Sequence, residues 1–298
     1  MPLIVVLLLI CVIAVICVIA PFGRPSETEE LSKDIERNEE EISAATGDIA
    51  ATTVGTNVKA TYTASTKEVQ IYSTSGIGTL KSDGTSGSIN RFWLKVYDKV
   101  ETVNFTNEVY AAEDSSYLFR GMNGSTWESL SKLTNIKNIQ NLKTNYMTNA
   151  TGMFMYCSSL TTLDVSGFDM SKVTSIEDMF QGCESLSEID VSNWNTTSIS
   201  DASRAFTRCR SLVKLDLSNW DFSSMTTLHG AFEDCTALSQ LIAGGQGMQD
   251  CDFSNAFAGC SSLVELDLSA WSGSFKYKSW NHFSRMFKAE AFNFWGFS

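Results

Sequence analysis

One motif recurs five times in the second half of the chain, at intervals of 25 or 26 residues. A typical copy, MFMYCSSLTTLDVSGF at Met153–Phe168, has a Phe, a Cys three residues later, and then Leu-x-x-Leu-x-Leu or Val. A single copy cannot bury these apolar residues by itself, whereas stacked copies align them into continuous columns. The period therefore predicts a solenoid. The repeat phenylalanines are Phe154, Phe180, Phe206, Phe232 and Phe257.

Degenerate copies around Phe119 and Phe287 extend the predicted solenoid to residues 117–298. The Leu-rich half of each copy is expected to form a short strand, and the Phe–Cys half a turn or short helix. These elements together predict an α/β solenoid of the leucine-rich-repeat type with right-handed coiling. The fourth copy is irregular after Leu241, and the last copy ends in an aromatic-rich stretch.

The pattern MFxxCxSLxxLDxSxW, with its period near 26, resembles the BspA-type leucine-rich repeats of microbial surface proteins. The resemblance covers more than half of the chain. It implies a secreted or anchored surface protein that takes part in adhesion to host or neighbouring cells.

The first residues suggest a membrane segment. Leu3–Ala20 contains eighteen consecutive apolar residues, close to the length that crosses a bilayer as a helix. No Lys or Arg precedes the run, and Pro21 follows its end, so an uncleaved signal anchor at 1–23 is favoured over a cleaved signal peptide. This interpretation predicts a single-pass membrane protein, with the membrane as a partner and the repeat domain on the extracellular side.

Two further regions are expected between the anchor and the repeats. Residues 24–50 are rich in acids and helix formers, which predicts a helical stalk, either a solvated spacer or a weak coiled coil that supports homo-oligomers. Residues 51–116 are predicted to form a small β-rich cap with strands at Val58–Ala64 and Glu68–Thr74. A further pair of strands is expected within Arg91–Phe105.

Composition excludes several functions. The net charge of -12 and the pI of about 4.7 argue against a nucleic-acid partner, which would need an excess of Lys and Arg. The repeat cysteines share one slot and lack CxxC spacing, so buried free thiols are expected and neither a metal site nor another cofactor is predicted. The histidines, His229 and His282, lie near no recognisable nucleophile motif. No catalytic residue and no enzymatic activity are predicted.

One face of the predicted strands is a candidate ligand-binding surface. In each regular copy an Asp lies between two inward-facing apolar residues, so its side chain should point outward. A solubilising role for these aspartates is favoured over calcium binding, because calcium needs about six to eight oxygen ligands. Beside them runs an aromatic column, either in the core or exposed as a binding stripe. The aspartates are Asp164, Asp190, Asp216 and Asp267, and the tryptophans of the aromatic column are Trp194, Trp220 and Trp271.

These observations predict a membrane-anchored surface protein whose solenoid binds a protein or a glycan, without catalysis. The alternative is a structural protein that associates laterally through its stalk and its aromatic C-terminus.

Overall fold

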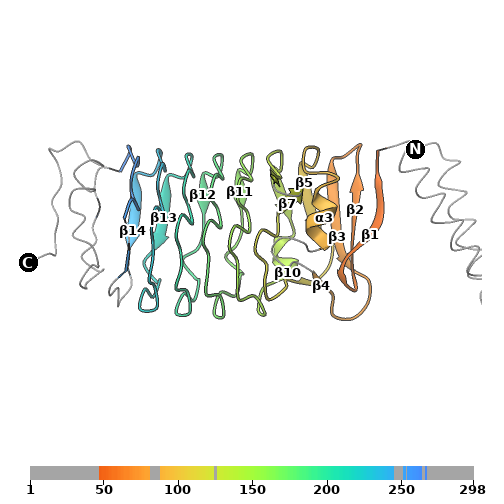
Figure 1. The fold of residues 1–298 in the computed structure, drawn as a ribbon, viewed down its shortest axis with the longest axis horizontal. Helices are drawn as coiled ribbons and strands as arrows, with labels where there is room; N and C mark the ends of the chain where they lie inside the picture. Colours follow the sequence, from red (N-terminus) through yellow and green to blue (C-terminus); the bar gives the residue numbers. More distant parts are fainter. Residues whose placement is uncertain are drawn as a thin grey trace, which may run out of the picture. The chain divides into compact units, whose positions relative to one another are not determined.

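The computed structural model of the chain describes residues 47–80, 88–123, 126–244, 251–252, 254–263 and 266 (Figure 1). Its contacts divide the chain into two compact units, Met1–Ala50 and Ala51–Ser298, and nearly all described residues belong to the second. The predicted anchor, the predicted stalk up to residue 46 and the C-terminal aromatic stretch lie outside the described residues.

The N-terminal part is a mixed eight-stranded sheet with the order β10-β6-β4-β1-β2-β3-β5-β9. The antiparallel pair β2–β3 confirms the two strands predicted near residues 58 and 68. From β3 onward the pairing changes to parallel, through β5 to β9. The strands are β1 (Ile49–Thr56), β2 (Val58–Thr63), β3 (Glu68–Ser73), β4 (Thr79–Leu80), β5 (Thr102–Phe105), β6 (Val109–Tyr110), β9 (Asn135–Lys137) and β10 (Leu142–Lys143).

The expected strand pair within Arg91–Phe105 is only partly correct. Its second half is β5, but its first residues end a helix, α3 (Ser88–Trp93). Ile89, Phe92 and Trp93 lie at helical spacing and are buried, so they cover one face of a helix rather than one face of a strand. The Trp93 indole Nε1 donates to the Leu118 carbonyl at 2.6 Å, which ties the helix to the first degenerate repeat.

The repeats stack through two separate parallel ladders. The first is formed by β11 (Thr162–Leu163) with β12 (Glu188–Ile189), and by β13 (Lys214–Leu217) with β14 (Gln240–Ala243). The second is a series of single bridges that joins one residue in each turn to its equivalent in the next. It runs through Asp114, Asn149, Ser175, Asp201, Thr227 and Asp252. A separate antiparallel hairpin, β7 (Arg120–Asn123) with β8 (Thr126–Ser129), interrupts the first degenerate turn.

The prediction of an α/β solenoid is wrong for the described residues. Their helices are α3 and the 3-10 turn η1 (Ile139–Asn141), and neither lies in a regular repeat. The reason is that alternate backbone amides of the repeats donate hydrogen bonds to the next turn and not to their own segment. In the turn around Phe154, the amides of Gly152, Phe154 and Tyr156 donate to carbonyls of the following turn at 2.7, 2.9 and 2.7 Å. These amides therefore cannot form the i to i−4 bonds of an α-helix.

The membrane predictions are also corrected. Within the part of the chain that the structure describes, no helix combines the length and the apolar character needed to cross a bilayer. The predictions of a transmembrane helix, of the membrane as a partner and of a single-pass extracellular topology disagree with this finding and are withdrawn. The segment at 1–23, on which they rested, lies outside the described residues.

A continuous phenylalanine column forms the centre of the stack. The rings of successive repeat phenylalanines are nearly parallel, with centroids 5.6 Å apart for Phe154–Phe180, 5.2 Å for Phe180–Phe206 and 5.8 Å for Phe206–Phe232. All of these side chains are buried. Burial of each ring contributes about 1.5–3 kcal/mol, and stacking adds about 0.5–1.5 kcal/mol. The column explains why the same residue recurs in every copy.

A second column consists of thiols. Cys183 and Cys209 donate through Sγ to the carbonyls of Phe154 and Phe180, each at 3.2 Å. Cys235 repeats this bond to the next Phe carbonyl at 3.0 Å. The described cysteines are all free and buried, which confirms the predicted thiol ladder. Burial raises the pKa of each of these thiols, to about 12 for Cys157.

We therefore expect the repeat cysteines to resist alkylation in the native protein. The thiolate is the reactive species, and both burial and the raised pKa suppress it. Iodoacetamide at about pH 8 should modify Cys183, Cys209 and Cys235 only as fast as the solenoid opens. Peptide mass spectrometry over a time course measures this, with the protein in guanidinium chloride as the fully labelled control. Rapid native labelling of Cys209 would contradict the buried ladder.

Candidate functional site

A shallow, open groove of about 550 Å³ lies on the outer face of the parallel strands. It crosses four neighbouring strands, β9, β11, β12 and β13, of which the last three follow one another along the stack in Figure 1. Its apolar floor is formed by Ile136, Leu163 and Ile189, and polar side chains line the rest. These polar residues are Asn135, Thr162, Asp164, Glu188, Asp190, Ser192, Lys214 and Asp216.

The alternation of side chains along each strand places the polar residues in the groove. In β13, Leu215 and Leu217 are fully buried, whereas Lys214 and Asp216 reach the surface. Parallel register then aligns equivalent residues of neighbouring turns, as in the pairing of Thr162 with Glu188. The structure places three aspartates on the outer face, as their spacing predicts, at positions 164, 190 and 216. Glu188 and Lys214 were not predicted, although the same alternation marks them as outward-facing.

Each groove aspartate is held by a serine two residues later. Asp164 Oδ1 accepts from the Ser166 amide at 3.2 Å and from its hydroxyl at 2.6 Å. Asp190 Oδ1 accepts from the Ser192 amide and hydroxyl at 3.0 and 2.7 Å. The Ser218 amide donates to Asp216 Oδ1 at 3.0 Å. One oxygen of each carboxylate is thus fixed locally, and the other remains available to a ligand.

These hydrogen bonds also favour the charged form of two groove carboxylates. The hydroxyl and amide of Ser192 lower the pKa of Asp190, and hydrogen bonds from Ser218 lower the pKa of Asp216. The groove contains four acids and one base, Lys214, so its formal charge is -3. Carboxylates on adjacent strands, roughly 4.8 Å apart, repel one another. The lowered pKa values of Asp190 and Asp216 keep these two side chains ionised at neutral pH despite this repulsion.

Several charged residues outside the groove form ion pairs between neighbouring strands or turns. Lys137 Nζ lies 2.8 Å from Glu68 Oε2 on the same face of the sheet, and Arg210 Nη1 lies 3.8 Å from Glu184 Oε1. In the described structure, none of the five charged groove residues forms an ion pair within 4.0 Å. The described groove therefore holds four carboxylates and a single amine, that of Lys214, which lies near Asp216 but forms no ion pair with it within 4.0 Å.

The aromatic column does not take part in this surface. Trp194 and Trp220 are 2% and 1% exposed, and their rings stack 6.1 Å apart. Each indole Nε1 donates at 3.0 Å to a carbonyl of the preceding turn, of Val165 for the first and Val191 for the second. The two tryptophans therefore belong to the core rather than to a binding stripe. The other two predicted face residues, at positions 267 and 271, lie outside the described residues.

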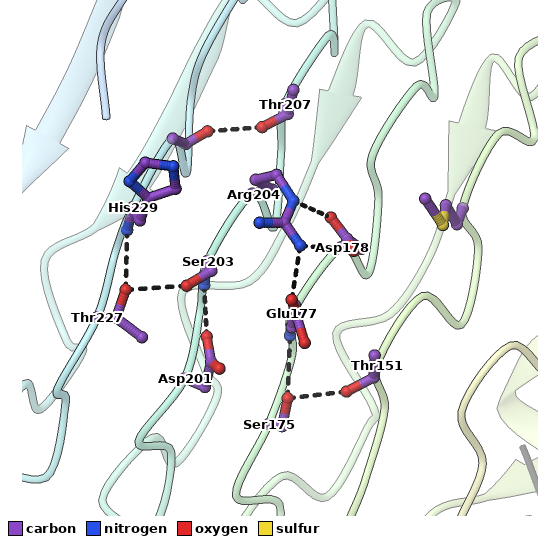
Figure 2. Close-up of polar contacts among 12 residues, drawn as sticks. Thr151, Ser175, Glu177, Asp178, Asp201, Ser203, Arg204, Thr207, Thr227 and His229 are labelled. Carbon is purple, nitrogen blue, oxygen red and sulfur yellow. Dashed lines mark hydrogen bonds and ion pairs between the residues drawn. The ribbon is translucent and has the colours of Figure 1, made fainter. Parts of the chain in front are cut away.

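The structure also brings together a histidine and a serine. His229 Nδ1 lies 2.8 Å from Ser254 Oγ, although the residues are 25 positions apart. Both occupy the slot three residues before a repeat Phe, so the period itself could have revealed the contact. It belongs to a set of hydroxyl contacts between turns, which Figure 2 illustrates with Thr151–Ser175 and Ser203–Thr227 at 2.8 and 2.9 Å. Among the described residues no carboxylate hydrogen-bonds the imidazole, so we interpret the contact as one that joins two turns.

Comparison with protein families gives a match over the repeats. The family model described as "Mycoplasma protein of unknown function, DUF285" matches residues 122–244 and 212–295, which together span more than half of the 298 residues. The chain belongs to this family. The first DUF285 match contains β9, β11, β12 and β13, so the groove is built entirely from the family's own repeat region.

Two solved bacterial structures show weaker similarity to this DUF285 protein. A leucine-rich repeat protein from Eubacterium ventriosum is 16% identical, covers 78% of this chain and 97% of its own, and has a TM-score of 0.24. A leucine-rich cell surface protein from Faecalibacterium prausnitzii is 15% identical, covers 73% and 82%, and has a TM-score of 0.18. No curated protein matches the sequence significantly. Because both TM-scores are low, the fold described above rests on the chain's own contacts.

Proposed function

We propose that this protein is a recognition module rather than an enzyme, and that its groove binds a protein or glycan that carries basic groups. Its place among BspA-type adhesion proteins is part of the same proposal. The observation that carries the proposal is the row of three carboxylates, at Asp164, Asp190 and Asp216, fixed in neighbouring turns of a groove whose formal charge is -3 and in which none of them forms an ion pair with a described residue.

Electrostatics explains why a basic partner is the best match. The groove carboxylates are positioned before binding, so a cationic partner loses little free energy in ordering them. Such a partner also relieves the repulsion between neighbouring carboxylates. The apolar floor around Ile136 and Ile189 offers a further contact for an aliphatic stem or the face of a sugar ring. The groove volume of about 550 Å³ lies within the roughly 300–1,000 Å³ of ligand sites, enough for a short peptide segment or a few sugar residues.

Arrays of immobilised peptides and glycans that contain basic, neutral and acidic members would test the proposal with the full-length chain. We expect saturable binding that is confined to basic peptides or amino-sugar glycans and that weakens as salt is added. Replacing all three aspartates by Asn should weaken this binding by at least about ten-fold, since each Asn keeps the local hydrogen bond from its serine but removes the charge.

Asp169 and Asp221 provide the matched control. Each is also held by a serine two residues later, with amide distances of 3.0 and 2.8 Å, but neither lines the groove. The native chain already has Asn195 in the equivalent slot. The double Asn variant at 169 and 221 should therefore keep full binding. Equal losses in the two variants, or no saturable ligand at all, would contradict the proposal.

A further inference from the structure

Each repeat contains two residues with a left-handed backbone, one two residues before the Phe and one two residues after it. We call these positions the leading slot and the trailing slot. In the turn of Phe154 they are Gly152 and Tyr156, with φ of 58° and 59°. The next four turns have the pairs Asp178 and Gly182, Arg204 and Arg208, Gly230 and Asp234, and Asn255 and Gly259.

Glycine would be the least strained residue in every slot, because other residues lose free energy in the left-handed region. In these five turns, however, six of the ten slots hold another residue. Tyr and Arg have no special tolerance for this conformation. Asp and Asn, which fill three of these six slots, adopt it more readily. The Tyr and Arg side chains in the other three slots need another explanation, and their contacts supply it.

The first type of contact places an aromatic ring over a glycine. The Tyr156 ring covers the trailing slot of the next turn, where a Cβ added to Gly182 would lie 2.3 Å from the ring. In the degenerate first turn, Tyr117 covers the leading slot in the same way, and a Cβ at Gly152 would lie 2.3 Å from it. Each tyrosine therefore requires a glycine in the same slot of the following turn.

The second type of contact pairs opposite charges. Asp178 is 7% exposed and receives two hydrogen bonds from the next leading slot, from Arg204 Nε at 2.8 Å and Nη2 at 3.1 Å (Figure 2). In the trailing slots, Arg208 Nε lies 3.8 Å from Asp234 Oδ2. Asp234 in turn covers Gly259, where a Cβ would lie 2.4 Å from its carboxylate. Tyrosine and aspartate thus each depend on the residue in the same slot of the next turn.

We infer that the two slots determine the order in which the turns stack. The Phe and Cys columns are the same in every copy, so they would be satisfied equally well if one turn were skipped. The contacts between the slot residues of successive turns would be lost. Without the Phe180 turn, Tyr156 would meet the side chain of Arg208, and without the Phe206 turn, Asp178 would face Gly230 and lose its guanidinium partner. The inference is independent of the proposed binding function.

Deleting one whole copy tests this directly. Removal of residues 195–220 joins Trp194 directly to Asp221. The new junction keeps the native Trp-Asp sequence, because Trp220 precedes Asp221 in the full chain. The deletion also stacks Asp178 against Gly230. Adding Gly230→Arg to this deletion should restore the ion pair and lower the unfolded population by about ten-fold or more. The same substitution in the full-length chain places two arginines together and should raise the unfolded population. An effect of Gly230→Arg in the same direction in both chains would overturn the inference.

Two glycine variants of the full-length chain keep the test decisive if the deletion does not fold. Gly182→Ala and Gly230→Ala have similar backbone costs, since φ is 72° and 60°. At Gly230, however, the nearest atoms are flexible side-chain atoms of Glu233 and Arg204 at 3.2 and 3.4 Å. Urea unfolding should show that Gly182→Ala increases the unfolded population about ten-fold more than Gly230→Ala does. The additional effect should largely disappear in the Tyr156→Asn background. Equal effects of the two alanines would overturn the inference.

Discussion

Phe206→Ala is expected to lower the free energy of unfolding by about 3–5 kcal/mol, among the largest effects of any single substitution in this chain. Phe206 is 1% exposed and lies between two other rings of the phenylalanine column, 5.2 Å from Phe180 and 5.8 Å from Phe232. Alanine would lose the burial of the ring and leave a cavity between the two neighbouring turns. Because those turns are held in place by the rest of the stack, they cannot move together to fill it. A loss of this size is a large share of the roughly 5–15 kcal/mol available to a typical domain.

Urea unfolding followed by circular dichroism measures this loss. Val213→Ala is a suitable control, because Val213 lies in the same turn but is 50% exposed and should change stability by less than about 0.5 kcal/mol. A loss below about 1 kcal/mol for the Phe206 variant would mean that the column contributes little, and the account of the core would then be incorrect.

Trp220→Ala is the second large effect, again about 3–5 kcal/mol. The substitution removes a fully buried indole, its stacking on Trp194 and the hydrogen bond to the Val191 carbonyl. Trp220→Phe should cost less, because Phe168 fills the equivalent slot of an earlier turn and is also buried. The remaining cost, about 1–3 kcal/mol, comes mainly from the carbonyl that loses its donor.

The same pair of variants separates a core role from a binding role. Thermal unfolding and array binding should be measured together on Trp220→Ala and Trp220→Phe. We expect a graded loss of stability, with ligand affinity retained at temperatures where the variants are folded. A variant with native stability but no binding would place the tryptophan column at the ligand surface after all.

The sequence predicted those features that depend on local alternation or on the period. Because side chains alternate along a strand, the outward direction of Asp164, Asp190 and Asp216 follows from the apolar residues on either side of them. The shared slot of the cysteines likewise predicted their burial as free thiols. Glu188 and Lys214 were missed because their slot varies between copies, so no recurring pattern points to them.

Other features depend on contacts between turns, which residue spacing does not encode. The Phe–Cys segment could form a helix or a series of turns, and hydrogen bonds to the next turn decide for turns. The left-handed slots are hard to recognise because Asp178 and Arg204 occupy positions where glycine would be expected. The direction of Trp194 depends on a carbonyl one turn away, at Val165, and could not be inferred from its neighbours in the sequence.

Carboxylate footprinting with a water-soluble carbodiimide tests most directly whether the groove is the recognition surface. The full-length chain would be labelled alone and at saturation with the basic peptide or amino-sugar glycan that binds it best on the arrays. We predict that the ligand protects Asp164, Asp190 and Asp216 several-fold, while labelling of Asp169 and Asp221 stays unchanged. Unchanged labelling of the groove under saturating ligand, or protection centred on another face, would contradict the account.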